Sequence, residues 1–172
     1  MDELTRFLNV WEQETAKTVS LLKCLPREQY DFRPDAEGRS LGELAWHLAE
    51  GDAYITHGIE RGQFDFDVKP AGIERPRKVE ELAPAFERIH RDAVERVKKL
   101  KPQDLDRSIT FFGLGPMPIR DLLWSLVLMH GIHHRGQLTL MCRLAGGTPT
   151  GVFGPTREDM AAMKTAAAAT AQ

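Results

Sequence analysis

The sequence has few cysteines, no long apolar run and an acidic rather than a basic start. Its cysteines, Cys24 and Cys142, form no CxxC pair, so a disulfide scaffold is not expected and a reducing, cytoplasmic location is. The longest apolar run, residues 122–129, is interrupted by Ser125 and is far too short to cross a membrane. The chain starts Met1-Asp2-Glu3, which is acidic, and no basic segment there is followed by an apolar stretch. No signal peptide is therefore expected.

Charge of one sign is not in excess either. The 172 residues include 23 Lys and Arg against 25 Asp and Glu, whereas a general nucleic-acid-binding protein is usually basic, so no nucleic-acid partner is expected. An apolar fraction of 42% is near the globular average and argues against disorder. The length is that of about one domain. We expect a single domain over residues 1–160 and an alanine-rich, fraying tail over residues 161–172.

Apolar side chains recur every three or four residues in four segments, which is the spacing of amphipathic helices. These segments cover residues 3–25, 40–62, 79–100 and 118–144. Ser40 and Glu43 have the spacing of a capping box, which marks the start of the second helix, and that helix is expected to fray from Gly58. No convincing set of strands accompanies them. The sequence therefore predicts an all-α fold, an antiparallel four-helix bundle.

The other segments are predicted to be connections. Residues 63–77 contain two prolines and form a loop long enough for a non-sequential crossover, so the sequence pattern alone leaves the order of the helices open. Residues 108–112 have strand propensity and form either a loop or a short hairpin with the glycines that follow. A short C-terminal helix is expected to begin near Thr156.

Three of the six histidines, His130, His133 and His134, occupy one turn of the fourth predicted helix. The apolar stripe of this helix consists of Ile119, Leu123, Leu126, Met141 and Leu144. At 100° per residue counted from Ile119, His130 falls at about 20° and His134 at about 60°, inside the stripe, and His133 falls at about −40°, at its edge. Gln137 falls at about 0°. This α-helical count predicts that the histidines lie on the buried side.

Two histidines one turn apart can hold one metal ion. His130 can pair with His134 or with His133, and the spacing does not decide between them. His47, on the apolar face of the second helix, can supply a third ligand, because facing helices in a bundle lie about 8–10 Å apart. Three protein ligands leave a coordination position open, as in catalytic sites. The plainer alternative is that each histidine is only a hydrogen-bonded core residue.

The run M-H-G-I-H-H-R-G-Q-L at residues 129–138 resembles the H-x-x-H-H-R-G-Q signature of the DinB family. Residues 144–149 and 152–156 are similar to the usual end of that family, and residues 44–49 resemble its second-helix motif. The resemblance extends over nearly the whole chain. It implies a bundle with an up-down-down-up order of helices.

The resemblance also implies a divalent metal held by His47, His130 and His134. His133 is not histidine in many relatives, which favours a role in lining the pocket or supporting a ligand. The family commonly forms homodimers, and most of its members lack an established reaction. Members of the wider superfamily transfer low-molecular-weight thiols or isomerise thiol adducts.

Other polar side chains near this motif have less specific interpretations. Arg135 falls near about 160°, off the apolar face, where it would be solvated, packed, or paired with an acid or a dimer partner. Gln137 would bond a ligand imidazole or satisfy a buried polar contact. Glu50 and Asp52 follow His47 on the second helix, and either is a candidate general base.

The remaining histidines and the cysteines carry no specific signal. His57 and His90 lie outside any cluster and are expected at the surface. Cys142 falls near about 140° on the fourth helix, pointing away from the site, and Cys24 belongs to no motif. Both thiols are expected to be packing residues.

The leading hypothesis is a metal-dependent enzyme that acts on a small molecule by hydrolysis or thiol transfer. Zn or Ni is the expected ion, with Fe or Mn as alternatives. A non-catalytic, metal-stabilised binding or stress-response module is the second hypothesis, and a helical dimer whose histidines never bind metal is the third. A homodimer is expected through faces outside the site, because Trp124 and Leu128 lie at about 140° and 180°, roughly opposite the histidines.

Overall fold

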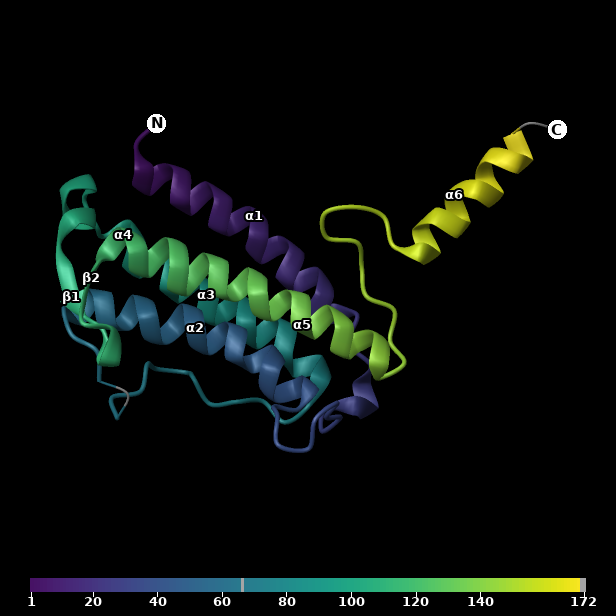
Figure 1. Cartoon of the computed structure of the whole chain (residues 1–172), viewed down its shortest axis with the longest axis horizontal. Coiled ribbons are helices and arrows are strands. Elements are labelled where there is room, and N and C mark those ends of the chain that lie inside the picture. The colour runs from purple at the N-terminus through teal and green to yellow at the C-terminus, as the bar shows by residue number, and fades with distance from the viewer. Residues whose placement is uncertain (66, 171–172) are drawn as a thin grey trace.

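The computed structural model describes residues 1–65 and 67–170. Long helices lie side by side, a small hairpin closes one end, and a last helix stands apart from the others (Figure 1). The helices are α1 (Glu3–Lys23), α2 (Leu41–Arg61), α3 (Val79–Lys98), α4 (Ile119–Asp121), the π-helical segment η4 (Leu122–Met129), α5 (His130–Leu144) and α6 (Arg157–Thr170). The predicted all-α fold is confirmed.

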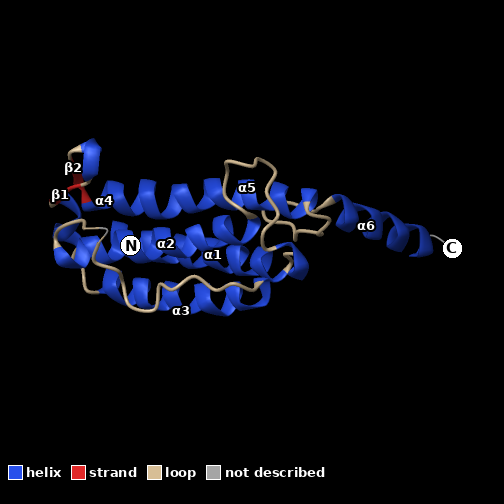
Figure 2. Ribbon diagram, turned by 90° about the horizontal axis from the view of Figure 1, so that it is seen from below, coloured by secondary structure: helices blue, strands red, loops and turns tan. Residues whose placement is uncertain are grey.

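Pairs of contacting residues give the direction of each helix. Contacts between α2 and α3 rise together in residue number, so these helices are parallel, and the same holds for α1 and the α4–η4–α5 rod. These pairs are Asp52–His90, Thr56–Arg96 and Glu60–Lys99 between α2 and α3, and Glu3–Arg120 and Glu14–Arg135 between α1 and the rod. Residues 62–65 and 67–78 connect the two helices and run back along α3, which allows them to be parallel (Figure 2). Contacts between α1 and α3, Thr15–His90 and Lys23–Glu87, run in opposite directions, so the order is up-down-down-up.

Local signals at the ends of α2 explain where the helix starts and stops. The Ser40 hydroxyl accepts a bond from the Glu43 N–H, and the Glu43 carboxylate accepts one from the Ser40 N–H, which is the predicted capping box. The helix does not fray at Gly58 but continues to Arg61. Gly58 is needed because a Cβ there would lie 2.2 Å from the Phe64 ring, and Gly62 ends the helix at a φ of 73°.

A short hairpin and a projecting C-terminal helix add to the four-helix bundle. Strands β1 (Ser108–Thr110) and β2 (Pro116–Pro118) pair antiparallel, so the segment of strand propensity forms the hairpin that was one of its two predicted forms. Helix α6 is exposed and projects from the bundle (Figure 1), with an ion pair of 2.8 Å between Arg143 and Glu158 near its start. The expected tail is thus helical as far as residue 170, while residues 171–172 of that prediction lie outside the described residues.

The η4 segment changes the orientation of everything after it. The N–H of His130 donates to the carbonyl of Ser125, five residues earlier, rather than to the fourth. Each residue in such a helix turns through roughly 80° instead of 100°, so eight residues turn α5 by about 160° relative to a continuous α-helix. The α-helical count made from Ile119 is therefore wrong from residue 122 onward.

Burial along α5 follows the turned orientation. Arg135, expected off the apolar face, is 2% exposed, whereas Leu144, expected in the core, is 56% exposed. Cys142 is 0% exposed, which confirms it as a packing residue. Arg135 donates to the backbone oxygen of Glu14 at 2.7 Å and forms an ion pair with the Glu14 carboxylate. Pairing with an acid was one of the predicted alternatives for Arg135, and the structure confirms it. Its burial excludes the solvated alternative.

The residues expected to form a dimer face lie within the chain's own packing. Leu128 is 5% exposed and belongs to the core. Trp124 packs edge-on against Phe7 with ring centroids 5.4 Å apart, and its indole N–H donates to Glu3 at 3.2 Å. The homodimer stays a prediction, but these two side chains no longer support it. Among the described residues, no helix is both long and apolar enough to cross a membrane.

Candidate metal centre

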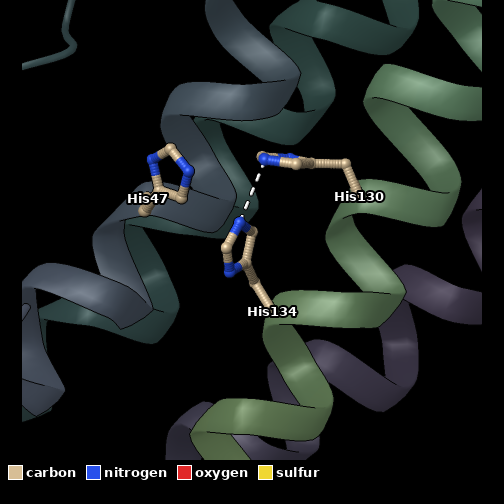
Figure 3. Close-up of side chains that lie close together, drawn as sticks. All are labelled: His47, His130 and His134. Atoms are coloured by element: carbon tan, nitrogen blue, oxygen red, sulfur yellow. Dashed lines mark hydrogen bonds between the residues drawn. The ribbon is translucent and has the colours of Figure 1, made fainter.

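His47 of α2 faces His130 and His134 of α5 across the boundary between the two helices (Figure 3). One ring nitrogen from each histidine lies within 4.8 Å of the others. The Nε2 atoms of His130 and His134 are 3.0 Å apart, and the His47 ring lies edge-on to both, with centroid distances of 5.2 and 4.8 Å. Because η4 turns α5, this cluster is half-buried at the edge of the bundle rather than on its core side.

Two of these rings are oriented by a neighbour one turn away. Nδ1 of His47 lies 3.2 Å from the Glu50 carboxylate, and Nδ1 of His134 lies 2.6 Å from the Gln137 side-chain oxygen. Both partners are acceptors, so each Nδ1 carries the hydrogen and each Nε2 keeps its lone pair. This is the arrangement that fixes the tautomer of metal-ligating histidines.

The donor set fits a divalent ion. Two nitrogens bound to one tetrahedral zinc at 2.0–2.1 Å are about 3.3 Å apart, close to the 3.0 Å between the Nε2 atoms of His130 and His134. Burial, and then the neighbouring His134 and His47, lower the pKa of His130 to about 4. Burial also lowers the pKa of His134. At neutral pH both rings are therefore in the uncharged form that binds metal.

The geometry distinguishes between candidates that the sequence left open. His133 is exposed and lies outside the cluster, so the structure brings together the pair spaced by four residues. Gln137 is exposed and bonds His134, rather than filling a buried polar contact. Glu50 contacts His47, whereas Asp52 is buried and faces α3. Glu50 is thus the carboxylate at the site.

Asp52 has a buried partner that the sequence analysis misplaced. Nδ1 of His90 lies 2.9 Å from the Asp52 carboxylate, and His90 is 4% exposed, packed edge-on against Trp11. The expectation of a surface position for His90 is therefore wrong. Its partner lies 38 residues away, so no local spacing indicates the pair. His57, also expected at the surface, is half-buried with its Nε2 enclosed.

Two cavities flank the histidine cluster. The larger, of about 470 Å³, contains His47 and His130 in its wall, and the smaller, of about 380 Å³, contains His134. Arg39 lines both. Neither Arg39 nor Phe111, which lines the larger cavity, was a candidate from the sequence, because both lie in connections whose positions depend on the fold.

Comparison with known proteins gives one consistent match. The family model of the DinB family matches residues 1–169. The Bacillus subtilis (strain 168) protein YrdA is 30% identical over 159 residues, which is 92% of each chain.

Two solved structures share the fold. A DinB-like protein from Bacillus cereus ATCC 10987 superposes with a TM-score of 0.70 at 29% identity, over 86% of this chain and 95% of that one. The DinB-like protein YjoA from Bacillus subtilis gives 0.68 at 23% identity, over 83% and 93%. With the bundle, the histidine cluster and these matches in agreement, the chain belongs to the DinB family.

Proposed function

We propose that this chain is a divalent-metal-dependent enzyme acting on a small molecule, with transfer of a thiol as its reaction. The observation that carries the proposal is the position of the histidine cluster between two cavities that share Arg39. A transfer reaction must bring two molecules to one centre, and two cavities meeting at the cluster suit that requirement. Hydrolysis, which needs one cavity and water, is the second candidate.

His47, His130 and His134 would hold the ion through their Nε2 atoms. A bound divalent ion supplies Lewis acidity, which lowers the pKa of a thiol or water at its open position. Three imidazoles and no thiolate suit borderline ions, so Zn or Ni is proposed ahead of Fe or Mn. Glu50 orients His47 and lines the larger cavity, which makes it the proposed acceptor of the proton that the thiol loses.

The experiment measures metal and turnover together. Purified protein should contain one divalent ion per chain, and His134→Ala should lose it, while the matched variant His133→Ala keeps it. The metal-loaded protein should accelerate the reaction of a small thiol with 1-chloro-2,4-dinitrobenzene, in which the sulfur bonds to the ring carbon, chloride leaves and the proton passes to a base.

Other results point to the other hypotheses. Hydrolysis of p-nitrophenyl acetate without thiol transfer would favour the hydrolase. Bound metal without either activity would favour a metal-stabilised binding or stress-response module. Full metal content in His134→Ala would refute the proposed ligand set.

A further inference from the structure

The larger cavity has chemically different ends. Along α2 its wall begins with His47 and Glu50 and ends with Tyr54 and Ile55. At a rise of 1.5 Å per residue, the step from His47 to Ile55 spans about 12 Å. Gly51 lies between them in the same wall, and a Cβ there would make an ordinary contact of 3.6 Å with Nδ1 of His130.

The far end is apolar and is built by three elements. Ile55 comes from α2, Leu126 from η4 and Phe111 from the turn of the hairpin. Phe111 is held in place by Phe64, with ring centroids 4.8 Å apart at 85°. This end can enclose an apolar group.

The near end of the cavity contains an arginine, Arg39. Arg39 is exposed, lines the cavity and forms no ion pair within the described part of the chain. The other arginines of this region, Arg33 and Arg75, both pair with Glu43, at 2.8 and 3.6 Å. The acidic group in the cavity wall, Glu50, is bonded to His47. Arg39 is therefore free to bind an anion.

We propose that this cavity binds an amphipathic carboxylate, with its apolar body against Phe111, Leu126 and Ile55 and its carboxylate on Arg39. An arginine guanidinium binds a carboxylate through two parallel hydrogen bonds, which fixes its orientation as well as its position. The ligand would then lie along α2 and past the histidine cluster. As an assignment of substrate class, this inference rests on the proposed function, but its binding step can be measured without turnover.

The test is calorimetric titration of chelator-treated protein with 4-phenylbutanoate and with its neutral counterpart 4-phenylbutanamide. Removing the metal prevents the carboxylate from binding an ion instead of Arg39. The carboxylate should bind about tenfold more tightly than the amide, and Arg39→Gln should abolish that difference. Arg91→Gln removes the same charge from the exposed face of α3 and should change neither affinity. Phe111→Ala should weaken both ligands about tenfold.

Several outcomes would overturn the proposal. These are equal affinity for the two ligands, no effect of Arg39→Gln, or equal losses in Arg39→Gln and Arg91→Gln. Because Arg39 is exposed, its substitution does not endanger folding. Selective binding with no thiol-transfer or esterase activity would refute the proposed enzyme and leave the anion site standing. Thiol-transfer activity without selective binding of the carboxylate would refute the anion site and leave the proposed enzyme standing.

Discussion

The Glu50 carboxylate lies 3.2 Å from Nδ1 of His47, one turn away on α2, and so holds that ring with Nε2 toward His130 and His134. Glu50→Ala should therefore lower metal affinity about 10- to 100-fold without removing a ligand. Competition with a chromogenic chelator measures the change. Glu95→Ala, on the exposed face of α3, is the matched control. Unchanged affinity in Glu50→Ala would show that the contact does not orient the histidine.

The stability of the metal-free protein should decrease in acid through His130. Its folded-state pKa is about 4, below the ordinary value near 6.5, so the unfolded chain binds more protons between these values. This contribution is complete above about pH 6.5 and is lost as the pH falls to about 4. Since the ring is partly exposed, we expect a loss on the order of 1–2 kcal/mol. Urea titrations across this range should show a weaker dependence in His130→Gln.

Metal should stabilise the fold without being required for it. At an ion concentration about 100 times the dissociation constant, binding adds about 2.7 kcal/mol, or about 5–10 °C in melting temperature. The effect should be lost as the pH falls through about 4, because protons then compete with the ion for His130. Melting curves with and without chelator test this. Unfolding on chelation alone would make the ion structural, and a melting temperature indifferent to chelator at pH 7 would argue against binding.

The buried pair of Asp52 and His90 should matter more to stability than any exposed ion pair. Burial raises the pKa of Asp52, and the hydrogen bond to His90 counteracts this rise. His90→Ala leaves the carboxyl buried without that partner, which should cost about 3–5 kcal/mol in free energy of unfolding. His57→Ala, a half-buried histidine without such a contact, is the control and should cost about 1 kcal/mol or less. Equal losses in the two variants would contradict the prediction.

Local spacing was enough to predict the parts of the fold that are determined locally. The four amphipathic segments and the capping box of Ser40 and Glu43 depend on residues a few positions apart. The spacing of His130 and His134 placed them one turn apart, as the structure has them. Contacts that form only through tertiary packing were not predicted. The pair of Asp52 and His90 joins two helices, and the position of Arg39 in the cavity wall depends on how its loop folds.

The orientation of α5 was wrong for a different reason. A helical count assumes one hydrogen-bonding pattern along the whole helix, and the sequence of η4 carries no local signal for bonds to the fifth residue. The error changed the predicted side of the bundle for His130 and His134 but not their spacing of four residues. The predicted grouping of these two histidines with His47 is therefore still found in the structure. Arg135 and Leu144 were placed on the wrong side of the helix, because their predicted positions depended on the helical count alone.

The π-helical segment also has a mechanical consequence. A rare hydrogen-bonding pattern persists over residues 122–129 only if contacts outside it hold the helix in that register. Return to an ordinary α-helix would rotate α5, separating His130 and His134 from His47 and Arg135 from Glu14. Both contacts therefore stabilise the π-helical form and the orientation of α5 that it gives. An ion bound by the three histidines would strengthen the first contact and so stabilise this form further. Amide hydrogen exchange at residues 126–130 should therefore slow when metal is added, a response that His47→Ala should remove.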